Sequence, residues 1–253
     1  MANEETQHQQ SPWTRPGFLM AGALVMLLVI AGVVLSIIFA LGGNDDADSN
    51  PSKPATTAAP TPDEGEGSGS SVCGLDGDVL EQARLSKAPT VDEWGYIGTT
   101  SHPISKEYGP GETDESGFYY CFQRSPEGAV FAAANAVALG TDTVLAPQWM
   151  KYFLADGPFS EQLLSELDES PSGATSASPP RMQIAGFRLL QYDGDSARVD
   201  MAVTTNANGQ AVTVSTIYDL LWEDGDWKLS SAKEDPIEVV AIPNIAGYVA
   251  WGE

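Results

Sequence analysis

Hydrophobic residues are densest between residues 18 and 41, a stretch of 24 residues without a charged side chain. As a helix this stretch would be about 36 Å long, enough to cross a hydrocarbon core of roughly 30 Å. A signal peptide has a shorter apolar region, typically about 7 to 15 residues, and a globular helix of this length normally has a polar face. The pattern therefore predicts an uncleaved transmembrane helix over residues 18–41, with a lipid bilayer as its partner.

Residues 42–71 are rich in Gly, Ser, Pro, Thr and acidic residues and contain almost nothing that could be buried. Such a segment cannot offset its ordering entropy, so a flexible linker is predicted, with a reach of roughly 30 Å. The chain is thereby divided into a head (1–17), a span (18–41), this linker, and residues 72–253. The last part, about 180 residues, has the size of one domain.

In residues 72–253, segments with helical spacing of apolar residues precede those with strand-like alternation. Residues 127–139 are rich in alanine and repeat apolar positions with a helical period. Ser125 is suited to the N-cap, and Pro126 to the first helical position. Shorter helices are predicted at residues 147–154 and 159–167.

Alternation with a period of two follows the helices and is typical of strands. Residues 193–194, 208–209 and 224–225 are Asp-Gly or Asn-Gly pairs, which favour two-residue hairpin turns. The resulting order predicts an α+β domain, with two or three helices packed on a curved four-strand antiparallel meander. The segments predicted as strands are 182–192, 197–205, 211–222 and 227–231.

Charge narrows the choice of partners. The formal net charge of -23 argues against nucleic-acid binding, which requires Lys and Arg to neutralise phosphates. It also argues against a second, electrostatic attachment to anionic lipid. Two readings of this charge stay open, a solvated acidic surface and an acidic face that selects a basic partner.

The two cysteines, Cys73 and Cys121, both follow the predicted span. An even pair outside the cytosol is most simply a disulfide, although two unpaired buried cysteines are the alternative. A disulfide implies an oxidising compartment, whereas the flanking charges, Arg15 and Lys53, say little about orientation. We therefore expect a single-pass protein of the cell membrane with a cytoplasmic N-terminus and an extracytoplasmic C-terminal domain.

Catalytic patterns are sparse in residues 72–253. The single histidine of this region, His102, is expected in a surface loop, and the sequence lacks a G-x-S-x-G elbow, a Walker A loop and a G-x-G-x-x-G turn. Residues 45–50 resemble a calcium loop only in part, because Pro51 stands where the turn continues. We expect no enzyme activity, no cofactor and no metal. A pair of facing carboxylates remains the alternative catalytic arrangement.

Aromatic side chains form the other group of interest. Their ordinary role is core packing, and the alternative is a pocket between the helices and the curved sheet. The candidate pocket residues are Phe131, Trp149, Phe153, Phe187, Tyr218 and Trp222.

Four blocks of sequence support a family resemblance: residues 71–75, 117–129, 183–190 and 222–228. They resemble a family of uncharacterised actinobacterial single-pass integral membrane proteins associated with mobile and conjugative elements. The order of helices and strands is similar to the cone-shaped nuclear-transport-factor-like fold. Membrane-anchored domains of that fold serve as assembly components in conjugation and type IV secretion.

Together the residues and the resemblance imply a non-enzymatic, membrane-anchored external domain. We expect it to mediate protein-protein assembly in the cell envelope as a component of a conjugative or type IV secretion apparatus. Its expected partners are envelope or transfer-apparatus proteins, with self-association into a homo-oligomer as a further option. The alternative is a module that binds a small molecule or a peptide in the pocket of the cone.

Overall fold

The computed structural model describes residues 71–169, 181–207 and 210–253 of the chain. Their helices are α2 (Pro126–Leu139), α3 (Ala146–Phe153) and α4 (Ser160–Glu169). Their strands are β1 (Glu93–Ile97), β2 (Thr100–Ile104), β3 (Glu112–Thr113), β4 (Tyr119–Tyr120), β5 (Met182–Tyr192), β6 (Ser196–Ala207), β7 (Gln210–Glu223), β8 (Asp226–Leu229), β9 (Ile237–Ile242) and β10 (Val249–Ala250).

The main sheet is antiparallel and has the strand order β10-β5-β6-β7-β8, with β9 also paired to β7. Strands β5 to β8 correspond to the four predicted segments. The turn between β7 and β8 consists of Asp224 and Gly225, whose φ angles are 52° and 75°. Both angles are positive, as a primed two-residue turn requires, which explains why an Asp-Gly pair stands there.

The predicted four-strand meander is wrong, because the main sheet has six strands. The additional strands, β9 and β10, follow the last predicted strand in sequence. β9 pairs with β7 over residues 213–218, next to the part of β7 that pairs with β8, and β10 pairs with β5. Neither pairing is a hairpin, so no turn motif in the sequence indicates it. The fold class is therefore corrected, and the similarity to the nuclear-transport-factor-like cone is not retained.

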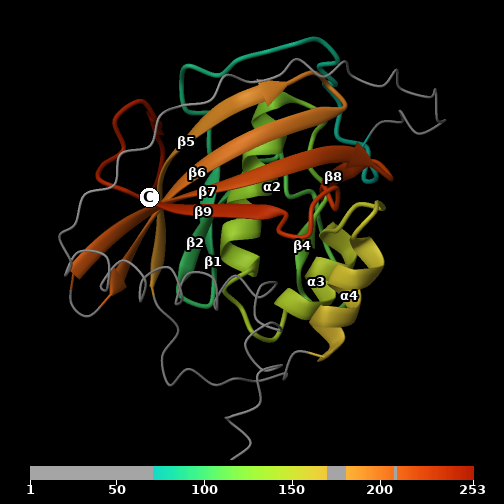
Figure 1. Ribbon diagram of the computed structural model, residues 1–253. Coiled ribbons are helices and arrows are strands. Elements are labelled where there is room, and N and C mark those ends of the chain that lie inside the picture. The colour runs from blue at the N-terminus through green and yellow to red at the C-terminus, as the bar shows by residue number, and fades with distance from the viewer. Residues whose placement is uncertain (1–70, 170–180, 208–209) are drawn as a thin grey trace, which may run out of the picture.

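Helix α2 lies at the centre of the molecule. All of its 14 residues except Glu127 are buried. It packs against β5 and β6 on one side and against the β1-β2 hairpin on the other, and Figure 1 shows it behind the main sheet. Alanine-rich sequence gives a narrow helix that fits between two layers. The hydroxyl of Ser125 accepts a hydrogen bond from the Gly128 N–H at 3.0 Å, which caps the helix as predicted.

No helix within the described ranges is long and apolar enough to cross a membrane. The predicted span, residues 18–41, lies outside those ranges. The described residues therefore contain no transmembrane helix, and the predicted location, a single pass through the cell membrane with an extracytoplasmic C-terminal domain, is corrected and not retained.

Candidate functional site

His102, the first candidate acid-base group, lies on β2 and is fully buried rather than in a surface loop. Its ring packs against Tyr119, with the ring centres 5.0 Å apart. Neither ring nitrogen has a hydrogen-bond partner among the described residues. Burial lowers the pKa of His102 from 6.5 to about 4. The side chain is therefore neutral at pH 7 and out of reach of a substrate.

This burial predicts a loss of stability in acid. The unfolded chain takes up a proton at His102 near pH 6.5, whereas the folded protein resists it down to about pH 4. Stability should therefore fall as the pH falls through this window, by about 3 kcal/mol at pH 4. Urea unfolding of the wild type and of His102→Leu at pH 7 and pH 4 would measure it. His8 is common to both proteins, so equal pH dependence in both would contradict the prediction.

Asp226, a buried carboxylate at the start of β8, is the second candidate group. Its Oδ2 accepts from the Cys121 N–H at 2.7 Å and from the Tyr152 hydroxyl at 2.8 Å. Its Oδ1 accepts from the N–H groups of Phe122 and Trp227, both at 2.9 Å. Burial raises the pKa of Asp226, an effect that these hydrogen bonds oppose. Both oxygens are occupied by the protein, so Asp226 ties the chain at residues 121–122 to β8.

Lys228 lies beside this carboxylate. Its Nζ donates to the Tyr152 carbonyl oxygen at 2.7 Å and lies 3.1 Å from the centre of the Tyr152 ring. Burial lowers the pKa of Lys228. The amine is thus held against an aromatic ring within the fold, and we define Asp226, Tyr152 and Lys228 as the buried polar cluster.

The predicted disulfide is confirmed. Cys73 and Cys121 are bonded, and their Cα atoms are 6.1 Å apart. The Cys121 backbone adopts a positive φ of 68° and donates to Asp226, so the disulfide and the buried polar cluster hold the same residue. Both features fasten the segment that precedes α2.

The six predicted pocket residues all lie in the core, with at most 8% of each side chain exposed. Phe131 and Phe187 both contact the ring of Trp251, at 5.2 and 5.5 Å between ring centres. Trp149 stacks on Phe153 at 4.6 Å. Trp222 packs against Trp227, and Tyr218 is fully buried on β7. Their arrangement is that of packed core side chains.

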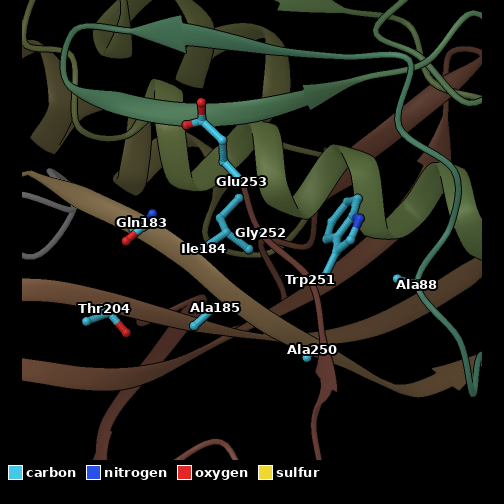
Figure 2. Close-up of a pocket in the computed structure, with 9 residues that line it drawn as sticks. All are labelled: Ala88, Gln183, Ile184, Ala185, Thr204, Ala250, Trp251, Gly252 and Glu253. Carbon is cyan, nitrogen blue, oxygen red and sulfur yellow. The ribbon is translucent and has the colours of Figure 1, made fainter.

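A depression of about 580 Å³ lies elsewhere, at the beginning of β5 (Figure 2). It is shallow and open, and none of the six predicted residues lines it. The indole N–H of Trp251 is buried nearby without a hydrogen-bond partner. The lining residues are Ala88, Gln183, Ile184, Ala185, Thr204, Ala250, Trp251, Gly252 and Glu253.

The border of the main sheet offers a more distinctive feature, β9, which Figure 1 shows beside β7. We call the outer border of residues 237–242 the β9 edge. Four of these six residues are β-branched and apolar, and 59% of Val240 is exposed. Apart from the pairing with β7, no backbone-backbone hydrogen bond among the described residues involves this strand. The β9 edge therefore presents unpaired backbone donors and acceptors.

Parts of the other borders of the same sheet are covered. Ala155 donates its N–H to the Leu229 carbonyl at 2.8 Å, which covers the outer border of β8. On the opposite side, β10 pairs with residues 186–187 of β5, and the Trp251 N–H donates to Ala185 at 3.2 Å. By contrast, the six residues of β9 have no such cover from any other described residue.

Residues 49–250 match the family described as a domain of unknown function, DUF8175. The chain belongs to this family. No curated protein and no solved structure matches it. The DUF8175 match includes nearly all of the described residues.

Sequence reasoning missed the β9 edge of this DUF8175 domain. A signal was present, because residues 237–242 read Ile-Glu-Val-Val-Ala-Ile, a β-branched run that favours a strand. The strand lacks an adjoining Gly-containing turn of the kind that marks the predicted hairpins. Its partner, β7, was also fully assigned to β6 and β8 by the hairpin pattern.

Proposed function

We propose that the DUF8175 domain is a non-enzymatic module that binds other proteins and takes part in their assembly. The observation that carries this proposal is the β9 edge. Exposed, unpaired edge strands template pairing with other chains, and natural sheets usually cover or charge them. This sheet covers part of the border of β8 with residues 154–155 and part of β5 with β10, whereas β9 has no backbone partner besides β7 among the described residues.

The positions of the candidate acid-base groups support a non-enzymatic role. A general acid or base has to reach the substrate proton within hydrogen-bond distance. His102 is fully buried in the core, and both oxygens of Asp226 already accept hydrogen bonds from the protein. These two groups serve the fold.

The identity of the partners is proposed from the sequence resemblance. Blocks at 117–129, 183–190 and 222–228 resemble uncharacterised actinobacterial proteins associated with mobile and conjugative elements. We therefore propose that the partners belong to a conjugative or type IV secretion apparatus. A small-molecule or peptide pocket in the core is the weaker proposal, because the six residues suggested for it are packed against other side chains.

Site-specific crosslinking tests the protein-binding role. A photoreactive amino acid placed at Val240, on β9, should crosslink to a defined partner protein in cells, which mass spectrometry would identify. Val144 is the matched control, because it is 78% exposed but lies in the loop between α2 and α3. The same proteins captured at equal yield from both positions, or none from Val240, would contradict the proposed function.

A further inference from the structure

We propose that β9 binds an extended segment of a cationic partner protein by strand addition, so that the segment becomes a further strand of the main sheet. This inference rests on the proposed protein-binding function and names the mode of binding and the charge of the partner. It is carried by the direction of the backbone groups of β9 and by the charges around the strand.

The direction of the β7 backbone groups follows from the two-residue turn at 224–225. The residues that flank such a turn, Glu223 and Asp226, form a hydrogen-bonded pair. β7 pairs with β6 without a bulge along its length, so the alternation continues and its odd-numbered residues face β8 and β9. The Asp219 carbonyl follows this rule, since it accepts from the Ser230 N–H at 2.8 Å.

The same alternation determines which groups of β9 are free. Glu238, Val240 and Ile242 pair with odd-numbered residues of β7, so their N–H and C=O groups point toward β7. The N–H and C=O groups of the alternate residues point outward. A six-residue strand extends about 20 Å and can pair with a segment of similar length. The outward-pointing residues are Ile237, Val239 and Ala241.

The side chains of β9 indicate which kind of residue an added strand should carry on each face of the sheet. Val239 and Ala241 pair with Thr216 and Val214 on the face of the sheet toward the core. Glu238 and Val240 lie on the opposite, exposed face. Cross-strand neighbours on one face interact directly, so an added strand should present apolar residues on the core side and charged residues on the exposed face of Glu238 and Val240.

The charges around β9 favour a cationic segment as the partner. Asp219 and Glu238 both form ion pairs with Arg198 and Lys233. Glu234 and Asp235, which shortly precede β9 in the sequence, form no ion pair among the described residues. Glu234 and Asp235 leave an excess of negative charge before the start of the strand, and the whole chain carries a net charge of -23. A second copy of this chain would be repelled, whereas a segment rich in Lys or Arg would be attracted.

A peptide-binding measurement with the full chain tests strand addition. The probe is a fluorescent octapeptide of alternating valine and lysine, and binding is measured by anisotropy. Ala241→Pro removes an outward N–H but no bond to β7, and should weaken binding about tenfold, the loss of one backbone hydrogen bond with some misfit. Ala241→Ser keeps this N–H and should bind like the wild type.

Further binding measurements test whether the bound segment has to be positively charged. An octapeptide of alternating valine and glutamate should bind at least about tenfold more weakly, and added salt should weaken the lysine peptide. Val240→Lys should reduce binding more than Leu190→Lys, which makes the same charge change at a residue of β5 that is 46% exposed. If Ala241→Pro does not fold, the comparison of Val240→Lys with Leu190→Lys still tests whether the peptide binds at β9.

Equal binding by Ala241→Pro and Ala241→Ser, both folded, would overturn strand addition. Equal binding of the two peptides, or equal effects of the two lysine substitutions, would overturn the preference for a cationic segment. If these tests fail while Val240 still crosslinks to a specific partner, the protein-binding function stands and the mode of binding is wrong. If the Val240 crosslink fails as well, the function itself is wrong.

Discussion

Replacement of both Cys73 and Cys121 by serine is expected to lower the free energy of unfolding by about 4 kcal/mol. The two residues are 48 positions apart, and closing a loop of this length restricts the unfolded chain by about that amount in the chain-entropy model. For a domain of this size the melting temperature should fall by roughly 8–16 °C. Differential scanning calorimetry of the two proteins would measure both quantities.

The loop closed by the disulfide explains where the effect should appear. It contains the β1-β2 hairpin and β3, and the hairpin covers one side of α2. Without the disulfide this cover can separate from the helix at lower cost. Amide hydrogen exchange in residues 93–104 should therefore accelerate more than exchange in β6.

A reducing agent provides the control. It should destabilise the wild type to the same extent as the double substitution and should leave the double-serine variant unchanged. A shift in melting temperature below about 3 °C in either experiment would show that the disulfide contributes little to folding.

Local signals in the sequence predicted much of the fold. β5 coincides with the predicted segment 182–192, and the turn at 224–225 has the two positive φ angles that its Asp-Gly sequence favours. Ser125 and Pro126 begin α2 as predicted. These features succeed because a turn or a helix cap depends on residues that are close together in the chain.

The sequence did not predict the contacts between segments that are far apart in the chain. β9 joins β7 across the intervening β8, and the pairing of β10 with β5 joins residues about sixty positions apart. Trp251, which follows β10, enters the core and contacts Phe131 and Phe187. Two of the six aromatic residues proposed for a pocket are therefore packed by a side chain from the C-terminal segment. Composition and periodicity cannot predict such an insertion.

The two candidate acid-base groups illustrate the same limit. His102 precedes Pro103, a sequence typical of a loop, but the hairpin lies against α2 and buries it. Asp226 directly follows the turn of the β7-β8 hairpin, a position at which an acidic residue indicates no special role. Its four donors come from three separate parts of the chain, residues 121–122, 152 and 227, and only the folded structure brings them together.

Asp226→Asn is expected to destabilise the domain by about 4 kcal/mol. Each oxygen of Asp226 accepts two hydrogen bonds, whereas the amide group of asparagine offers one accepting oxygen and one donating nitrogen. Two buried donors would lose their acceptor, at about 1–3 kcal/mol each. Urea unfolding monitored by tryptophan fluorescence would measure the change.

Asp224→Asn is the matched control. It makes the same chemical change two residues away, at an exposed position whose φ of 52° asparagine tolerates. Its effect should stay within about 0.5 kcal/mol. Equal effects of the two substitutions would show that net charge, rather than the hydrogen bonds of Asp226, matters at this site.

Combining Asp226→Asn with the double-serine variant should reveal coupling, because the disulfide and Asp226 both hold Cys121. Once the disulfide is absent, residues 121–122 can move to find other acceptors or water, so Asp226→Asn should cost less than it does in the wild type. The combined loss is therefore expected to fall short of the summed losses by about 1 kcal/mol or more. Strict additivity would mean that the two features stabilise the domain independently.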